Sequence, residues 1–242
     1  RRGDCMEKFY TEIARYYDYI FPVGNAQLQL ILETAGHPPK EILDVACGSG
    51  GYSKSLSDMG YSVTAIDLDE SMVQILKEKD ERINAQVLNM LDINDLTGSF
   101  NLIFCIGNSL VHLNDLKEIG LFLKSCKNKL KTNGKLLLQI VNYDRILDKE
   151  ITSLPEIKNE EKNLRFERYY NYLPEQHKID FKTILTVNGE VLENHILLFP
   201  IKSEELKELL KAAGFTGVEF YGSFKKDNYE PMESFSLVVI AE

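Results

Sequence analysis

Tryptophan is absent from this chain of 242 residues, and no apolar run approaches the length of a membrane span. A helix that crosses a bilayer needs about 20 consecutive apolar residues. The opening Arg-Arg-Gly-Asp-Cys-Met also lacks the apolar core of a secretion signal. Because 44% of the residues are hydrophobic and the charges are mixed, the composition is typical of a soluble globular protein. We therefore expect a cytoplasmic protein that does not bind a membrane.

Cysteine is scarce, and no two cysteines form a Cys-x-x-Cys pair; they are Cys5, Cys47, Cys105 and Cys126. Such pairs are the usual signature of a zinc site or a redox dithiol. Cys47 and Cys105 lie in apolar contexts, where a buried free thiol is common. We expect free thiols in a reducing compartment, with no disulfide and no bound metal.

Basic side chains are outnumbered, with 28 Lys and Arg against 37 Asp and Glu and a formal net charge of -9. Proteins that bind nucleic acids normally carry a basic face. The charge balance therefore disfavours a nucleic-acid partner, and we expect the partner to be a small molecule.

The stretch 42–53, Ile-Leu-Asp-Val-Ala-Cys-Gly-Ser-Gly-Gly-Tyr-Ser, predicts a buried strand, a glycine turn and the start of a helix. Gly48 and Gly50 let the backbone approach a ligand, and the free amides of a helix start point toward it. A strand-to-helix turn without a ligand would show the same pattern. The third glycine of a dinucleotide-binding turn would stand where Ser53 does, and no Lys-Ser or Lys-Thr pair follows. This disfavours a nicotinamide oxidoreductase and excludes a Walker-type phosphate loop.

A second predicted strand, 63–66, ends at Asp67. In an open parallel sheet, ligands bind outside the carboxyl ends of the strands. A carboxylate roughly 20 residues after the glycine turn can accept hydrogen bonds from both hydroxyls of a ribose. Asp67 could instead cap the next helix, although Asp69 and Ser71 stand in better positions for that role.

Together these stretches resemble the class I S-adenosylmethionine-dependent methyltransferases. Asp44-Val-Ala-Cys-Gly48-Ser-Gly50 is similar to the first motif of that family, and Ile66-Asp67-Leu-Asp-Glu-Ser-Met72 is similar to the second. The resemblance implies S-adenosyl-L-methionine as cofactor, with the glycine turn under its methionine part and Asp67 on its ribose. The cofactor has no pyrophosphate, which agrees with the missing third glycine.

Residues 7–20 form an aromatic, helical pattern that an amphipathic helix packed on the core would also show. In the family, an N-terminal segment carrying Tyr-Asp often closes over the cofactor, which implies that role for Tyr17-Asp18. Arg15 is the only arginine between positions 3 and 81, so it is one candidate to hold the methionine carboxylate. Helix or loop amides could serve instead.

A third predicted strand, 85–88, precedes Asn89 and Met90. The resemblance implies that Asn89 bonds the adenine amino edge and that Met90 packs on the ring, although a polar strand end above a core methionine would have the same sequence. The cofactor-binding residues implied by the resemblance are Arg15, Tyr17, Asp44, Ala46, Gly48, Gly50, Asp67, Leu68, Met72, Asn89, Met90 and Ile106.

Polar residues follow two further predicted strands, 100–106 and 135–141, at the edge where the methyl group should point. Asn108 and His112 come after the first of these strands, and Tyr143 comes after the second. His112 titrates near neutrality when unperturbed, so it could act as a base, orient an acceptor or have a structural role only. These three are the candidate catalytic residues.

Residues 105–113 and 142–147 resemble the corresponding stretches of the glycine and sarcosine N-methyltransferases, so that the resemblance covers residues 10–147 in all. The glycine enzyme has an arginine just before Asn-Tyr-Asp, which is expected to hold the carboxylate of its substrate. This chain has Val141 there, and glycine is therefore disfavoured as the substrate.

The segment 150–163 is charged and predicted to be a loop. Three strands are predicted after it, 164–173, 177–187 and 191–199, and Asn188-Gly189 is a hairpin signal between the last two. This layout also resembles that of the sugar N,N-dimethyltransferases. Such a β-meander could cover the acceptor site or make a contact in a homo-oligomer.

We predict an α/β fold with a Rossmann-like, doubly wound, seven-stranded sheet that is mostly parallel, with the last strand antiparallel. Residues 1–150 and 200–242 should form the cofactor-binding domain with an N-terminal helical lid, and 151–199 the inserted meander. The expected activity is methyl transfer from S-adenosylmethionine to a small-molecule acceptor, an amine first. A hydroxyl acceptor and a cofactor-binding module without catalysis remain alternatives.

Overall fold

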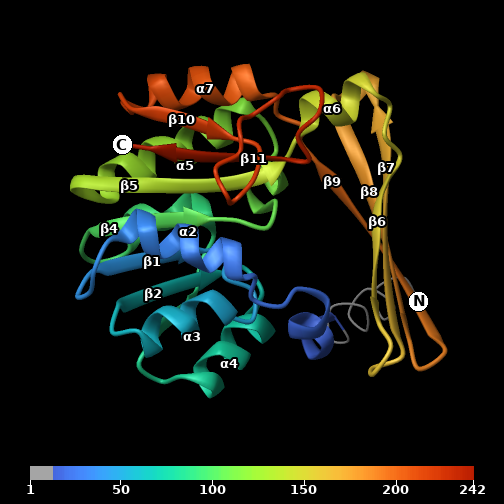
Figure 1. Ribbon diagram of the computed structural model, residues 1–242, viewed down its shortest axis with the longest axis horizontal. Coiled ribbons are helices and arrows are strands. Elements are labelled where there is room, and N and C mark those ends of the chain that lie inside the picture. The colour runs from blue at the N-terminus through green and yellow to red at the C-terminus, as the bar shows by residue number, and fades with distance from the viewer. Residues whose placement is uncertain (1–12) are drawn as a thin grey trace.

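A computed structural model describes residues 13–242 and contains two separate β-sheets (Figure 1). The larger sheet has the order β10-β11-β5-β4-β1-β2-β3. Its strands are β1 (Glu41–Val45), β2 (Ser62–Asp67), β3 (Asn84–Val87), β4 (Phe100–Cys105), β5 (Leu130–Val141), β10 (Val218–Tyr221) and β11 (Ser236–Ala241). Only β11 runs antiparallel to its neighbours, β5 and β10, so the predicted sheet is confirmed.

The strand order reverses between β1 and β4, which lie side by side and parallel in the middle of the sheet. The loops that leave these two strands therefore diverge in opposite directions. This arrangement opens a ligand crevice at the carboxyl ends of the strands. The glycine turn follows β1 at this place.

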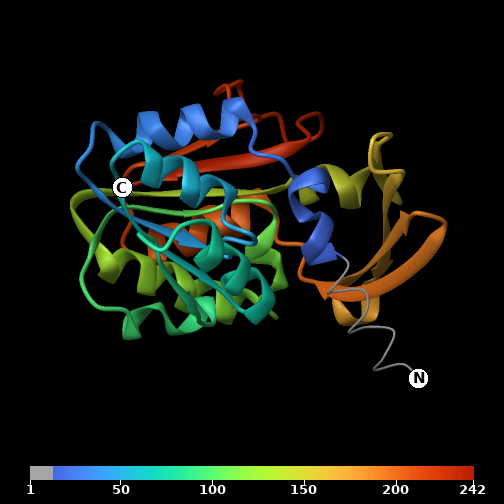
Figure 2. The same ribbon diagram turned by 90° about the horizontal axis from the view of Figure 1, so that it is seen from below.

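Helices cover both faces of the larger sheet, as Figure 2 shows from below. The helices α2 (Asn25–Ala35), α3 (Gly51–Asp58) and α4 (Glu70–Lys79) pack on one face, where alternate strand residues such as Ile42 and Phe104 are fully buried. The helices α5 (Leu116–Lys129) and α7 (Ser203–Ala212) pack on the other face, against Leu43 and Ile103. Both faces are buried, which explains the nearly continuous apolar runs in the strands.

The smaller sheet is antiparallel and consists of β6 (Ser153–Asn159), β7 (Leu164–Leu173), β8 (Lys178–Val187) and β9 (Glu190–Leu198). It stands beyond the carboxyl ends of the parallel strands, and the short helix α6 (Tyr143–Asp148) joins it to β5 (Figure 1). The prediction of three strands is confirmed. The prediction that 150–163 is a loop is wrong, because β6 pairs with β7 and turns its apolar side chains, Leu154 and Ile157, to the protein. The charges that suggested a loop lie on the exposed face of this edge strand.

A local irregularity lies at Asn133-Gly134, a dipeptide that is common in turns. The structure keeps β5 continuous from Leu130, although its pairing with β4 shifts register between Phe100 and Leu102. Asn133 has a φ of 62° there, so the polar dipeptide forms an irregularity inside the strand and does not reverse the chain.

Residues 13–20 are helical and follow the predicted helical pattern of 7–20, whose first part lies outside the described residues, as does Cys5. The other three cysteines are free thiols. No helix within residues 13–242 is both long enough and apolar enough to cross a bilayer.

Candidate functional site

The glycine turn after β1 has the left-handed backbone that its sequence predicts. Gly48 and Gly50 have φ values of 54° and 76°, which L side chains rarely adopt. A Cβ on Gly48 would lie 2.8 Å from the ring of Tyr17, and a Cβ on Gly50 would lie 2.3 Å from Leu76. Ala46 also has a positive φ, of 58°, so the chain bends sharply as soon as the strand ends. A larger residue at either position would be strained.

Asp67 at the end of β2 holds this turn through its carboxylate. Its Oδ2 accepts a hydrogen bond of 2.8 Å from the N–H of Gly48, and its Oδ1 accepts one of 2.9 Å from the N–H of Asp69. Burial raises the pKa of Asp67, and no lysine or arginine within the described residues pairs with it. A carboxylate can accept about four hydrogen bonds, so acceptor capacity remains on Asp67 for a ribose hydroxyl.

Asp69, and not Asp67, caps the next helix, so the alternative role that the sequence left open for Asp67 is not seen. The Oδ1 of Asp69 accepts hydrogen bonds from the N–H groups of Ser71 and Met72 at the start of α4. Met72 is itself buried, 6% exposed, below the turn, whereas Leu68 beside Asp67 is 70% exposed. The apolar side chain of Leu68 is therefore exposed to solvent next to the Asp67 carboxylate.

Asp44 lies within β1 and is almost fully buried. Its Oδ2 accepts a hydrogen bond of 2.6 Å from the hydroxyl of Ser53 in α3. Burial raises the pKa of Asp44 to about 7, and the nearby charge of Asp67 adds to the increase. The serine that stands in place of the third glycine thus joins the strand to the helix behind the turn.

The N-terminal helical segment is fixed on the glycine turn by Asp18. The Asp18 carboxylate accepts a hydrogen bond from the hydroxyl of Ser49 and forms an ion pair of 2.6 Å with Lys79. Lys79 also donates to the backbone oxygen of Ser49. This brings the ring of Tyr17 against Gly48, and burial together with the charges of Asp67 and Asp44 raises the pKa of Tyr17. Sequence reasoning missed Ser49 and Lys79, because Lys79 is separated from Asp18 by 61 positions.

Arg15 is exposed on this segment, and its guanidinium lies 5.5 Å from the centre of the Tyr16 ring. Within the described residues it forms no ion pair and does not join Tyr17 at the turn. Its predicted role toward a carboxylate is therefore not supported by a contact and stays a prediction.

Asn89 and Met90 begin the short 3-10 helix η1 (Met90–Asp95) after β3. The Oδ1 of Asn89 accepts a hydrogen bond of 3.0 Å from the N–H of Leu91, and Met90 packs partly against the core. These contacts agree with the polar strand end that the sequence left open. The amide oxygen of Asn89 retains a second lone pair for an adenine amino group.

Asn108 and Tyr143 meet where β4 and β5 end, as the sequence predicts for the acceptor edge. The side-chain amide of Asn108 donates a 2.9 Å hydrogen bond to the Tyr143 hydroxyl, and its carbonyl accepts one from the N–H of Val141. Tyr143 is 1% exposed, and burial raises its pKa well above the usual value. Half-buried Ile106 precedes this pair. The site thus has a rigid, uncharged polar group at this edge.

His112 does not join that pair. It ends the short 3-10 helix η2 (Ser109–His112), keeps an exposed surface, and forms no hydrogen bond or ion pair within residues 13–242. The surrounding protein nevertheless lowers the pKa of His112 by desolvation. Desolvation therefore makes His112 a weaker base than an ordinary imidazole.

The smaller sheet contributes aromatic residues that the sequence did not single out. The ring of Tyr170 in β7 lies 6.3 Å from that of Tyr143. On the same strand, Phe166 lies 5.7 Å from Phe21, whose ring is 5.2 Å from that of Tyr17. One face of β7 therefore reaches both the acceptor edge and the segment above the glycine turn.

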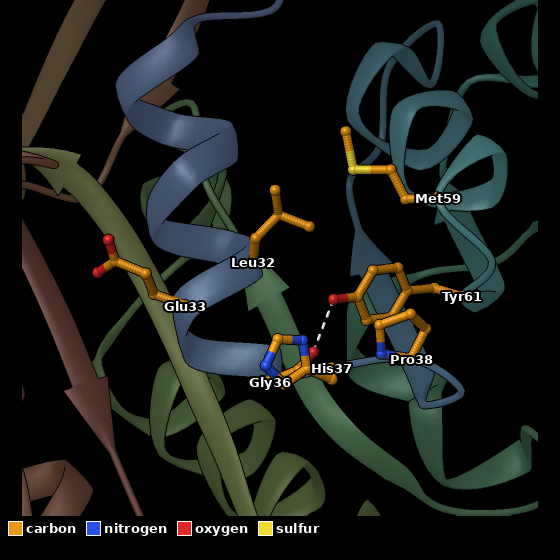
Figure 3. Close-up of a pocket in the computed structure, with 7 residues that line it drawn as sticks. All are labelled: Leu32, Glu33, Gly36, His37, Pro38, Met59 and Tyr61. Atoms are coloured by element: carbon orange, nitrogen blue, oxygen red, sulfur yellow. Dashed lines mark hydrogen bonds between the residues drawn. The ribbon is translucent and has the colours of Figure 1, made fainter.

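Another hollow lies at the opposite, amino-terminal edge of the sheet and is drawn in Figure 3. Its lining includes Leu32, Pro38, Met59 and Tyr61, and the Tyr61 hydroxyl donates a 2.6 Å hydrogen bond to the backbone oxygen of Gly36. This hollow has mostly apolar walls. The polar candidate residues described above lie instead at the carboxyl ends of the strands.

Comparisons with known proteins agree with this geometry. A family model described as a methyltransferase domain matches residues 42–134. The chain is 25% identical over 218 residues to the glycine/sarcosine N-methyltransferase of Parasynechococcus marenigrum (strain WH8102), covering 86% of this chain and 73% of the relative. It is 33% identical over 129 residues to glycine N-methyltransferase of Homo sapiens, covering 46% of this chain and 44% of the relative.

Among solved structures, an S-adenosylmethionine-dependent methyltransferase from Clostridium acetobutylicum ATCC 824 has a similar fold. Its TM-score is 0.81 at 16% sequence identity, with 96% of this chain and 98% of that chain covered. At this identity the likeness establishes the fold, including the smaller sheet within the covered region. The aligned part of the human relative is less than half of its length, so that relative's substrate does not transfer directly to this chain.

Proposed function

Since this chain belongs to the class I S-adenosylmethionine-dependent methyltransferases, as its motifs predict, we propose that it methylates the amine nitrogen of a small molecule. The two sequence relatives described above are named for N-methylation, which supports an amine acceptor. We propose the same division of parts as the sequence suggested: residues 1–150 and 200–242 bind the cofactor, and 151–199 cover the acceptor. A cytoplasmic location agrees with the free thiols.

The residues at the carboxyl edge fit S-adenosylmethionine. Asp67 keeps acceptor capacity for ribose hydroxyls, and the Tyr17 ring lies close against the Gly48 backbone at the turn. The Asp67 carboxyl lies beside the turn and has no lysine or arginine partner within residues 13–242, which leaves it available to a ligand. When bound, the cofactor supplies a methyl group on a positively charged sulfur. The protein's part is to align an acceptor with it, and such alignment can lower a barrier by roughly 7–11 kcal/mol.

We propose an amine as the acceptor because the polar side chains where β4 and β5 end, Asn108 and Tyr143, are uncharged. Asn108 and Tyr143 bond each other, and the raised pKa of Tyr143 keeps its hydroxyl protonated. An amine must lose its proton before it attacks, but the neutral amine then needs no strong base during methyl transfer, only orientation by hydrogen-bonding groups. A hydroxyl acceptor needs a base during the reaction, and His112, with its lowered pKa, is a weak one.

The smaller sheet supports a covering role because its buried face packs on the rest of the chain. Leu164, Phe166 and Leu185 pack with Tyr16 and Ile20 of the N-terminal segment. Tyr170 and Ile179 belong to the main core together with Tyr143. A sheet that served only as a contact between copies would not need these contacts.

The test is calorimetric titration of the protein with S-adenosylmethionine and, separately, with NAD. A panel of amines and alcohols is then scored for release of S-adenosylhomocysteine. We expect binding of S-adenosylmethionine and turnover on amines. Turnover on alcohols alone would replace the amine proposal with O-methylation. Binding without any turnover would favour a non-catalytic module.

A further inference from the structure

A row of polar side chains crosses the buried face of the smaller sheet. Arg168 in β7 is paired with Thr183 in β8, and Thr183 is paired with Asn194 in β9. Directly opposite residues of neighbouring strands point to the same face. Thr183 and Asn194 are 5% and 4% exposed, so this face is the one turned to the protein.

The rows on either side of this polar row are apolar. On one side lie Phe166, Leu185 and Leu192, which pack with the N-terminal segment. On the other side lie Tyr170, Phe181 and Ile196, which pack with the main core. The polar row therefore separates two hydrophobic clusters, and its residues do not serve to fill either of them.

Arg168 carries a charge that no carboxylate of the described chain balances. One of its Nη atoms donates a 2.7 Å hydrogen bond to the backbone oxygen of Pro155, whereas its Nε is buried and has no hydrogen-bond partner among residues 13–242. Burial lowers the pKa of Arg168. An unpaired, partly buried guanidinium is costly, and such groups normally find an anion.

Arg165, on the opposite face of the same strand, differs from Arg168 in its charge partners. Arg165 is exposed and forms ion pairs with Glu156 and Glu167. The exposed Arg165 is thus neutralised by carboxylates, whereas the inward-facing Arg168, three positions later on the same strand, has no carboxylate partner within residues 13–242. The chain supplies acidic partners where β7 faces solvent.

The position of Arg168 on β7 places it between the two parts of the candidate site. Phe166, two residues earlier, touches Phe21 and through it Tyr17 above the glycine turn. Tyr170, two residues later, touches Tyr143 at the acceptor edge. Side chains two residues apart on one strand face are only about 6.6 Å apart.

We propose that Arg168 binds an anionic group of the methyl acceptor, so that the acceptor is an amine that also carries a carboxylate or a phosphate. Thr183 and Asn194 extend the polar surface beside it. This inference rests on the proposed function. It gives the acceptor site a guanidinium from the inserted sheet, whereas position 141, at the end of β5, has a half-buried valine.

The first experiment compares Arg168→Gln with the matched control Arg165→Gln in the full chain. The probes are amine pairs that differ only in the anion, such as glycine with glycinamide, β-alanine with β-alaninamide, and phosphoethanolamine with ethanolamine. We expect the wild type and Arg165→Gln to prefer the anionic member of the accepted pair. We expect Arg168→Gln to raise the KM for that member roughly 10- to 100-fold, the loss expected for one charged hydrogen bond, and Arg168→Lys to recover part of it.

The affinity for S-adenosylmethionine, measured by calorimetry, should be the same in all variants, which also shows that they fold. Equal use of both members of each pair by the wild type would overturn the inference while leaving the methyltransferase function standing. So would a folded Arg168→Gln that prefers the anionic member as the wild type does. Failure of the wild type to bind S-adenosylmethionine would instead refute the proposed function.

A second measurement does not depend on turnover. The Nε–H resonance of Arg168 in a proton–nitrogen NMR spectrum is assigned by its loss in Arg168→Gln. Protein saturated with S-adenosylhomocysteine is then titrated with acetate and, separately, with inorganic phosphate. We expect a saturable shift of this resonance with one of the two anions, which identifies the source of the charge. No shift with either anion would overturn the inference.

Discussion

The carboxylate of Asp67 accepts a 2.8 Å hydrogen bond from the N–H of Gly48, so the end of one strand holds the turn that follows its neighbour. This contact joins the two segments that the sequence singled out, and it leaves acceptor positions on Asp67 for a ligand. The same carboxylate thus holds the turn in place and lies at the carboxyl edge of the sheet, where a ligand would bind.

Replacing Asp67 by alanine should weaken the binding of S-adenosylmethionine by at least 10-fold, because a charged hydrogen bond is worth about 1.5–3 kcal/mol. Calorimetry measures the dissociation constant. Asp69→Asn is the matched control, since it alters the neighbouring carboxylate but keeps an acceptor for the cap of α4. Equal losses of affinity in the two variants would contradict a ligand role for Asp67.

Gly48→Ala should weaken cofactor binding because the new Cβ would meet the Tyr17 ring at 2.8 Å in a left-handed backbone. The strain alone costs about 1–2 kcal/mol of stability. Gly36→Ala isolates this strain, since Gly36 also has a positive φ but a Cβ added there would meet nothing within 4 Å. We expect both variants to lose thermal stability and only Gly48→Ala to lose affinity for S-adenosylmethionine. Undiminished affinity in Gly48→Ala would show that the turn does not contact the cofactor.

Asp44 should make the protein less stable as pH rises toward neutrality. Its pKa is raised from 3.8 to about 7 in the folded state, so the folded chain binds this proton more tightly than the unfolded chain. The resulting stabilisation is fully present below pH 3.8 and is lost as pH rises through about 7. Asp44→Asn mimics the neutral acid and keeps an acceptor for Ser53.

The measurement is the melting temperature of the wild type and of Asp44→Asn between pH 5 and pH 8, the interval around the value of about 7. We expect the variant to gain on the wild type up to about pH 7 and the difference to level off above that value. A constant difference between the two proteins would mean that Asp44 does not titrate there.

His112→Ala should lower turnover and leave the affinity for S-adenosylmethionine unchanged, because His112 lies on η2, outside the hydrogen bonds of the glycine turn. Since desolvation lowers its pKa, protonation of His112 should reduce the wild-type rate only below pH 6.5. The pH profile of kcat in both proteins is the measurement. An identical acid limb in His112→Ala would exclude His112 as its source, and an affinity loss equal to that of Asp67→Ala would refute the separation of roles.

The sequence predicted the larger sheet, and it placed Asn108 and Tyr143 at the same edge of that sheet, because both predictions depend on strands and their carboxyl ends. Periodicity locates a strand, and parallel topology brings the ends together. It could not predict the contact of Asp18 with Lys79 or the exposed position of Arg15, which depend on how a helix docks. β6 was missed because the charges of an edge strand resemble those of a loop. Arg168 was missed because its face is set by the register of β7, which composition does not reveal.

Tyr143→Phe should lower kcat without changing the affinity for S-adenosylmethionine. The substitution removes the hydroxyl that accepts the 2.9 Å hydrogen bond from Asn108, and it leaves that buried amide without this partner, at a cost of about 1–3 kcal/mol in stability. If the hydroxyl also orients the acceptor, kcat falls by roughly 10-fold beyond any loss of folded protein. Tyr229→Phe is the matched control, because the Tyr229 hydroxyl bonds Asn142 and Asp144 and does not bond Asn108. A similar loss of stability in both variants with an unchanged kcat in Tyr143→Phe would show that Tyr143 only supports the fold of the acceptor edge.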